Sequence, residues 1–98
     1  MKENIINWAK DRNLITKDNQ NKQFLKLIEE TGELASGMAK NDIIKIIDSI
    51  GDIQVVLIIL AKQYDLDIDH CLEAAWHEIK DRKGKTVNGI FIKDESNT

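Results

Sequence analysis

LKLIEETGELASGMAKNDIIKIIDSIGD, residues 25–52, contains two acidic segments that each lie beside apolar sequence. Wound into a helix of about 3.6 residues per turn, its first half separates into two stripes. The mainly apolar stripe comprises Phe24, Leu27, Ile28, Thr31, Leu34, Ala35 and Met38, and the charged stripe comprises Lys26, Glu30, Glu33 and Gly37. This spacing predicts an amphipathic helix that extends to about Lys40.

The second half of the stretch continues as a helix from Ile43 to about Gln63, once Asn41-Asp42 has interrupted the pattern and offered an N-cap. Residues 53–60 are apolar almost all round and are therefore expected to be buried. Their β-branched composition also fits a buried strand, but the helical spacing that begins at Ile43 runs into them without a breaker. One side of this helix carries Lys45, Ser49, Asp52, Val56 and Ile59, with Asp48 at its edge.

The acidic residues of the two segments indicate a site for a divalent cation. An ionised carboxylate beside apolar sequence, as at Asp52, is costly unless a cation or hydrogen-bond donors meet it. Carboxylates brought together repel one another, and a hard cation such as Mg²⁺ relieves that repulsion. Two alternatives remain open: a solvated glutamate-rich helix face, and an Asp52 held by Lys45 or by a partner's arginine. Gly51, beside the acids, is expected to let a neighbouring helix approach closely.

The two segments, Lys26 to Ala35 and Asp48 to Asp52, resemble the MazG-like family of all-α nucleoside triphosphate pyrophosphatases. That family carries EExxE on one helix and ExxD on the next, and its acids bind Mg²⁺. The resemblance extends from about Trp8-Ala9 to Lys80–Gly84. It implies that Glu30, Glu33 and Asp52 are metal ligands for Mg²⁺, with Mn²⁺ as an alternative.

Ser49 departs from the family pattern, because it stands where the glutamate of ExxD is expected. A serine hydroxyl is a neutral and weaker ligand than a carboxylate. Asp48 lies next to it and stands four residues before Asp52, within reach of a shared cation. We therefore expect Asp48 to serve as the replacement ligand.

The activity that the resemblance implies is hydrolysis of a ribo- or deoxyribonucleoside triphosphate to the monophosphate and pyrophosphate. Glu29, close to the charged stripe, is expected to orient the attacking water or act as the general base. Substrate binding is assigned to Lys26, Lys80, Arg82, Lys83 and Trp8, although Trp8 is also a natural packing residue. Two alternatives are a phosphoribosyl-ATP pyrophosphohydrolase and a helical oligomer that binds a nucleotide or protein partner without turnover. No GxxxxGK[ST] motif is present, so P-loop binding is excluded.

Composition sets further expectations. The 98 residues suit one domain over residues 1–93, followed by a frayed tail at 94–98. A net charge of −3 argues against nonspecific nucleic-acid binding. The longest apolar run, residues 53–61, is far shorter than the ~20 residues that cross a bilayer, and no signal peptide is visible. The lone Cys71, interpreted as a core residue, fits a reducing cytosol, so we expect a cytoplasmic protein.

The remaining segments complete an all-α prediction: a MazG-like helical bundle with a short C-terminal hairpin or extended tail. A short helix is expected over residues 3–13, and Asn19 or Asn21 is expected to cap the next one. Asp67 is the expected N-cap of a last helix that ends near Gly84, its C-cap candidate. The face of that helix expected to pack into the bundle comprises Ile68, Cys71, Leu72, Ala75, Trp76 and Ile79, whereas His70 and His77 lie on its solvated side.

The C-terminal hairpin is expected to turn at Asn88-Gly89. Three longer helices from one short chain leave the apolar surface of residues 53–60 hard to cover. We therefore expect a homodimer or homotetramer whose four-helix core is completed by self-association.

Overall fold

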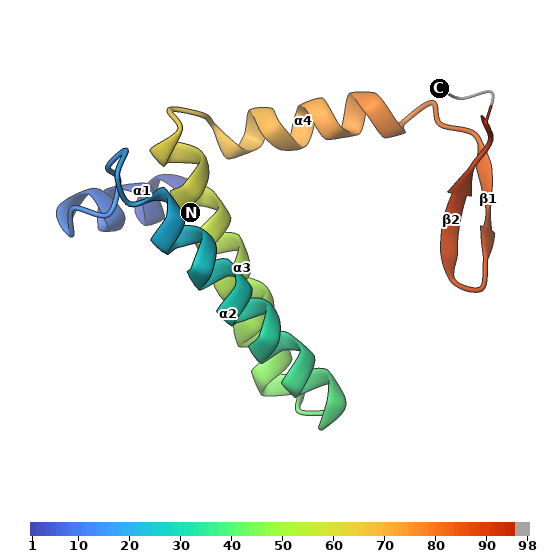
Figure 1. Cartoon of the computed structure of the whole chain (residues 1–98), viewed down its shortest axis with the longest axis horizontal. Coiled ribbons are helices and arrows are strands. Elements are labelled where there is room, and N and C mark those ends of the chain that lie inside the picture. The colour runs from blue at the N-terminus through green and yellow to red at the C-terminus, as the bar shows by residue number, and fades with distance from the viewer. Residues whose placement is uncertain (96–98) are drawn as a thin grey trace. The chain divides into compact units, whose positions relative to one another are not determined.

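The computed structural model describes residues 1–95 of the chain as four helices followed by a two-stranded antiparallel hairpin (Figure 1). The elements are α1 Lys2–Asp11, α2 Gln20–Ala39, α3 Ile43–Gln63, α4 Ile68–Ile79, β1 Gly84–Val87 and β2 Ile90–Lys93. The predicted helical fold with a short C-terminal hairpin is confirmed. Among the described residues, no helix combines the length and apolarity that a membrane crossing requires.

Contacts within the chain group into two units, Met1–Ile68 and a second that begins at Asp69. The first contains α1, α2 and α3, and the second contains α4 and the hairpin. The prediction of one domain over residues 1–93 stays a prediction. Residues 96–98, the last part of the predicted frayed tail, lie outside the described residues.

The helices α1, α2 and α3 each end in the same way, with a polar residue in the left-handed conformation just after the helix. Asn13, Asn41 and Asp65 have φ values of 57°, 53° and 58°. In each case the next backbone N–H reaches back to a carbonyl of the last helical turn, as Asp42 does to Gly37 at 2.9 Å. Asparagine and aspartate tolerate this conformation better than most residues, so the chain itself encodes where these helices stop.

The helix starts agree only in part with the expected caps. The Asp42 side chain accepts a hydrogen bond from the backbone N–H of Lys45 at 3.2 Å, which confirms it as the N-cap of α3. Asn19 is the N-cap residue of α2, but its side-chain amide donates to the Leu14 carbonyl at 3.3 Å rather than capping the helix.

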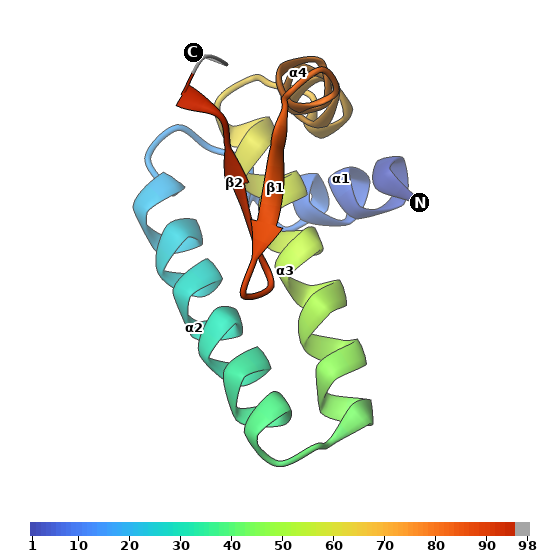
Figure 2. The same ribbon diagram turned by 90° about the vertical axis from the view of Figure 1, so that its right-hand side faces the viewer.

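The helices α2 and α3 form an antiparallel pair, side by side in both views (Figure 2). The pair is tightest at its turn, where a Cβ built on Gly37 would lie 3.3 Å from the Ile46 backbone nitrogen and 3.3 Å from Lys45 Cβ. The expected close approach at Gly51 is not found within this chain, because a Cβ there would meet nothing within 4 Å. Gly37 is therefore the glycine that the pairing requires.

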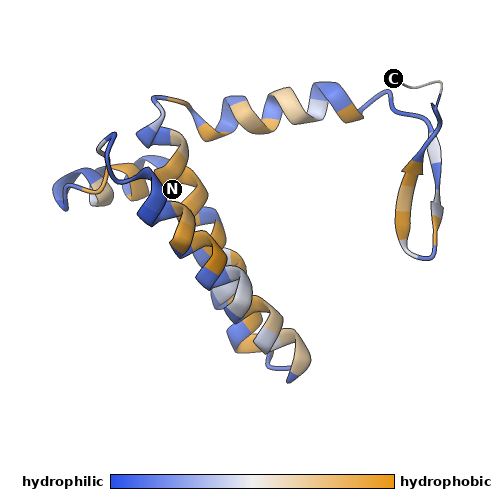
Figure 3. Cartoon of the chain, viewed as in Figure 1, coloured by the Kyte–Doolittle hydropathy of each residue, from blue (hydrophilic) through white to orange (hydrophobic). Residues whose placement is uncertain are grey.

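The apolar core of this unit is small. Its buried hydrophobic residues are Ile6, Ala9, Val56, Ile59 and Ala61. Of the run 53–60, expected to be buried throughout, only Val56 and Ile59 are, and the others except exposed Gln54 are half-buried. Apolar positions along α2 and α3, coloured orange in Figure 3, remain exposed in the single chain.

The buried polar side chain of Gln63 closes the core beside α1. Its amide nitrogen donates to the Leu14 carbonyl at 2.8 Å, and its own backbone carbonyl accepts from the Gln20 amide at 3.2 Å. These two bonds attach the end of α3 to the connection that leads into α2. An ion pair 2.9 Å long between Lys2 of α1 and Asp67, which follows α3, also ties α1 to the end of α3.

In the second unit, α4 has no buried residue, so the predicted packing of its apolar face is not observed. Leu72 is 71% exposed and Cys71 is an exposed thiol, so the interpretation of Cys71 as a core residue is wrong for the single chain. His70 and His77 are exposed, as expected. Within the second unit, α4 is accompanied by the short hairpin alone among the described residues, and two four-residue strands offer too little apolar surface to bury one face of a helix.

The hairpin turns at Asn88-Gly89, as predicted, with φ values of 51° and 80°. Two positive φ angles match the type I′ turn that suits a two-residue hairpin. Gly84 is not a helix C-cap: it opens β1 opposite Lys93. A Cβ on Gly84 would clash with the Ile92 carbonyl oxygen and lie 2.8 Å from Lys93 Cα, so only glycine fits there.

We expect Gly37→Val to lower the free energy of unfolding by about 1–3 kcal/mol, because its side chain would press on the backbone of α3. Gly32→Ala, whose Cβ would meet nothing within 4 Å, is the matched control. It should raise stability by about 1 kcal/mol through helix propensity alone. Urea unfolding followed by circular dichroism measures both, and a Gly37→Val chain as stable as the parent would contradict the close approach.

Candidate metal and nucleotide site

The surface between α2 and α3 is polar along part of its length. Gln23 and Glu30 of α2 are both 8% exposed, and Ser49 of α3 is 3% exposed. The charged stripe predicted on α2 therefore faces α3, and the Ser49 side of α3 faces α2. Buried polar groups need partners, and Glu30 has one in Lys26 of the same stripe.

Lys26 neutralises the acids at the start of the charged stripe. Its ammonium group lies 3.3 Å from Glu30 Oε1 and 3.4 Å from Glu29 Oε1. The hydrogen bond to Glu30, followed by the charge of Glu29, raises the pKa of Lys26 above its ordinary value. The Glu30 side chain is 11% exposed, whereas those of Lys26 and Glu29 are about half exposed or more. Glu30 is thus the acid that most depends on the amine.

Lys45 of α3 neutralises Glu33 across the helix pair. Its Nζ lies 3.0 Å from Glu33 Oε2 and donates to Ser36 Oγ at 3.3 Å. The sequence suggested Lys45 as a possible partner of Asp52, but the described contacts give it to Glu33 instead. The physical reason is the direction of the side chain, which crosses toward α2 near the helix turn.

Asp48 and Asp52 lie exposed on α3 and together line a cavity of about 440 Å³ with Met1, Ile5 and other residues of α1 and α3. Within residues 1–95, no three acidic, histidine or cysteine side chains come together as a metal-binding group. One chain therefore does not gather the four expected ligands Glu30, Glu33, Asp48 and Asp52.

The donor chemistry at Glu30 and Glu33 nevertheless fits Mg²⁺, a hard cation that binds carboxylate oxygens. Both glutamates lie on the side of α2 that faces α3, and each is charge-balanced by an amine that a cation can replace. Ser49, buried opposite, adds a hydroxyl oxygen rather than a third charge.

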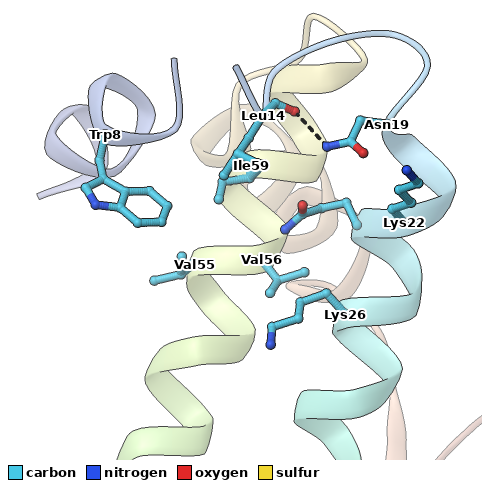
Figure 4. A pocket seen from close by; sticks show the side chains of 9 residues that line it. Trp8, Leu14, Asn19, Lys22, Lys26, Val55, Val56 and Ile59 are labelled. Carbon is cyan, nitrogen blue, oxygen red and sulfur yellow. Dashed lines mark hydrogen bonds between the residues drawn. The ribbon is translucent and has the colours of Figure 1, made fainter. Parts of the chain in front are cut away.

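A second cavity, of about 400 Å³, lies between α1, α2 and α3 (Figure 4). Trp8 on one side and Lys26 on the other are directed toward Val55 and Val56 of α3. The Arg12 guanidinium carbon lies 4.3 Å from the Trp8 ring centroid, a cation–π contact that holds the indole in place. With Trp8 47% exposed, the cavity offers an aromatic surface beside an amine.

Sequence reasoning missed Gln23 and Asn19, which also line this cavity. Gln23 continues the charged stripe of α2 by about one turn toward the N-terminus, since it precedes Lys26 by three residues. Extending the stripe would have found it. Asn19 lies before the helix and carries no comparable signal in the sequence.

The three other cations assigned to substrate binding belong to the second unit. Arg82 pairs with Glu78 at 3.3 Å on the end of α4, and the backbone carbonyl of Lys83 accepts a hydrogen bond from the Asp94 N–H at 2.8 Å. The role of Lys80, Arg82 and Lys83 in binding phosphate stays a prediction.

The first unit is thus a set of packed helices with a glutamate-rich face on α2 and a cavity of about 400 Å³ beside it. Residues 19–87 match the model of the MazG nucleotide pyrophosphohydrolase domain, which covers more than half of the chain. The chain therefore belongs to this family, as the sequence resemblance predicted.

A relative from Haemophilus phage HP1 (strain HP1c1), described as an "Uncharacterized 18.2 kDa protein in rep-hol intergenic region", is 59% identical over 66 residues. The match covers 65% of this chain and 39% of that protein, so the chain spans well under half of its relative's length. No solved structure matches the chain.

We expect Lys26→Met to destabilise the metal-free protein by about 1–2 kcal/mol, because the buried Glu30 carboxylate loses a charged hydrogen-bond partner. Adding Glu30→Gln to that variant should recover most of the loss. Glu29→Gln, which alters the exposed partner of the same lysine, is the control and should change stability by less than about 1 kcal/mol. Urea unfolding in a chelator measures all three, and a Glu29→Gln change as destabilising as Lys26→Met would contradict the assignment.

Proposed function

We propose that this chain hydrolyses nucleoside triphosphates to monophosphates and pyrophosphate in a Mg²⁺-dependent reaction. The observation that carries the proposal is the family match over residues 19–87, which spans Glu29, Glu30, Glu33 and Asp52. Burial of Glu30 at the α2–α3 surface supports it, because it holds a carboxylate, paired with Lys26 in this chain, where a cation could take the place of the amine.

Glu30, Glu33 and Asp52 would hold the cation, with Asp48 as an additional ligand in place of the acid missing at Ser49. When bound, Mg²⁺ neutralises phosphate oxygens and lowers the pKa of a coordinated water. Glu29 is exposed and one residue from Glu30, so it is suited to accept the proton of the water that attacks the α-phosphorus. The bond from that phosphorus to its bridging oxygen breaks, and pyrophosphate leaves.

The cavity beside Trp8 is the place we propose for the nucleoside. A half-exposed indole stacks on any base, which supports broad rather than strict base recognition. Lys26, which lines the same cavity and contacts Glu30, would bind a phosphate oxygen near the acids. Lys80, Arg82 and Lys83 stay proposed phosphate-binding residues because of their charge.

A second candidate function is nucleotide or partner binding without turnover. Ser49 favours it, because a neutral hydroxyl stands where the family pattern has a carboxylate. Among the described residues, moreover, no three metal-binding side chains come together in the single chain. Phosphoribosyl-ATP is retained as a further substrate to test.

We also propose that the chain works as a homodimer or homotetramer. Eight large apolar side chains of the α2–α3 pair are exposed in the single chain: Phe24, Leu25, Ile28, Met38, Ile43, Ile44, Ile47 and Ile50. Surfaces of this kind are typical of protein interfaces rather than of monomers. A partner that covers them can also bring a second set of acids toward the first.

The exposed Cys71 outside any disulfide supports a reducing, cytoplasmic compartment.

Purified protein with Mg²⁺ should convert members of a panel of NTPs, dNTPs and phosphoribosyl-ATP to the monophosphate and pyrophosphate, resolved by chromatography. Glu33→Gln and Asp52→Asn should each lower kcat by at least about a hundredfold, since even outer partners of a metal are worth 10–100-fold. Both variants should also lose the rise in melting temperature that Mg²⁺ gives the parent. Asp48→Asn should follow Asp52→Asn if Asp48 is a ligand.

Glu3→Gln, an exposed acid in the first turn of α1, is the control and should retain full activity. If no substrate of the panel is hydrolysed while nucleotide binding persists, the protein is a binding module and the enzymatic proposal is wrong.

Self-association should appear in sedimentation as a mass at least twice the 11.2 kDa of one chain at micromolar concentration. The melting temperature should also rise with protein concentration, because association stabilises the folded state by mass action. A charged substitution in the exposed patch, Ile47→Glu, should shift the protein toward the monomer, whereas Lys17→Glu in the loop before α2 should not. A monomer with a cooperative thermal transition would refute self-association.

A further inference from the structure

Lys45 of α3 forms an ion pair with an acid of α2, Glu33. Its Nζ lies 3.0 Å from Glu33 Oε2 and 3.3 Å from Ser36 Oγ, so the ammonium group has two oxygen partners. The Lys45 side chain is 31% exposed, and that of Glu33 is 51% exposed. The pair is therefore only partly screened by water.

The backbone fixes where this amine can lie. The N–H of Lys45 is bound by the Asp42 side chain at the start of α3, and its Cβ sits against Gly37 of α2. Lys45 thus occupies the position where the two helices approach most closely. Ser49, one turn further along the same side of α3, is buried and uncharged.

These positions give the helix pair a particular balance of charge. Glu30 on α2 pairs with Lys26 and Glu33 pairs with Lys45, so each of these two carboxylates has an amine beside it. An acid at position 49 would stand one turn from Lys45, within reach of the same amine. A carboxylate that is already neutralised attracts a second cation less, because the amine and the metal compete for the same oxygens.

We propose that Lys45 is a built-in counter-cation for Glu33, a positioning residue that limits how tightly, and how many, divalent cations this face can bind. The inference rests on the proposed function, since it concerns the cation that the reaction would use. Without Lys45, the affinity for divalent cations and the number bound would depend on the acids alone.

Titration of the full-length protein with Mn²⁺, followed by calorimetry and by the electron paramagnetic resonance of the unbound ion, tests the proposal. Lys45→Met should lower the Kd for Mn²⁺ by about tenfold, as expected for removing one nearby positive charge at a partly exposed site. Lys62→Met is the matched control, because it removes the same charge about 25 Å further along α3. Its Kd should equal that of the parent.

Ser49→Glu supplies a second arm of the test. Alone, it should add little Mn²⁺ binding, because Lys45 lies one turn away and can neutralise the new carboxylate. Combined with Lys45→Met, it should increase the number of ions bound. Lys45→Gln, which keeps a hydrogen-bond donor for Ser36 but carries no charge, serves if Lys45→Met does not fold, and should also tighten binding.

The outcomes separate this inference from the proposed enzymatic function. An unchanged or weaker Mn²⁺ affinity in Lys45→Met and Lys45→Gln overturns the role of Lys45, even if the parent hydrolyses nucleotides. Tighter Mn²⁺ binding in these variants supports the role of Lys45, even if neither the parent nor the variants hydrolyse any triphosphate. In that second case the enzymatic proposal fails by itself.

Discussion

The close approach of α2 and α3 at Gly37 is the contact on which the rest of the first unit depends. A side chain at this position would press on the backbone of Ile46, so glycine lets the helices start their pairing almost in backbone contact. The turn that follows, with Asn41 in the left-handed conformation, sends α3 back along α2. Because both helices are rigid, this turn sets which residues meet further up the pair, Glu33 with Lys45 among them.

The pairing also has an unusual distribution of polarity. Polar side chains, including the buried Glu30 and Ser49, occupy part of the surface between the helices, while large apolar ones such as Ile28 and Ile47 face outward. The hydrophobic effect normally drives the reverse arrangement. The outward apolar surface is therefore best understood as one side of a larger core, which agrees with the proposed assembly. The inward polar surface is then available for the chemistry of the family.

Charge balance connects this architecture to function. Ser49 is neutral where the family pattern has a glutamate, and Lys45 lies beside Glu33. Both features reduce the negative charge that a divalent cation would find. Less repulsion among carboxylates makes the metal-free protein more stable, since unscreened like charges oppose folding. The same change weakens the attraction for the ion. In the proposed site, stability without metal and affinity for metal are therefore opposed, and Lys26 and Lys45 favour the first.

The sequence alone determined the elements of this protein. Helical spacing gave the bounds of α3, and Asn88-Gly89 gave the hairpin turn, because both depend on local geometry. The motif also identified the family and placed Glu30 and Glu33 on one stripe. Tertiary structure decided what those residues contact. That Lys45 would pair with Glu33 follows from the rotation of one helix about its axis relative to the other. Periodicity shows which residues share a face, but the direction of that face is fixed only when the helices pack.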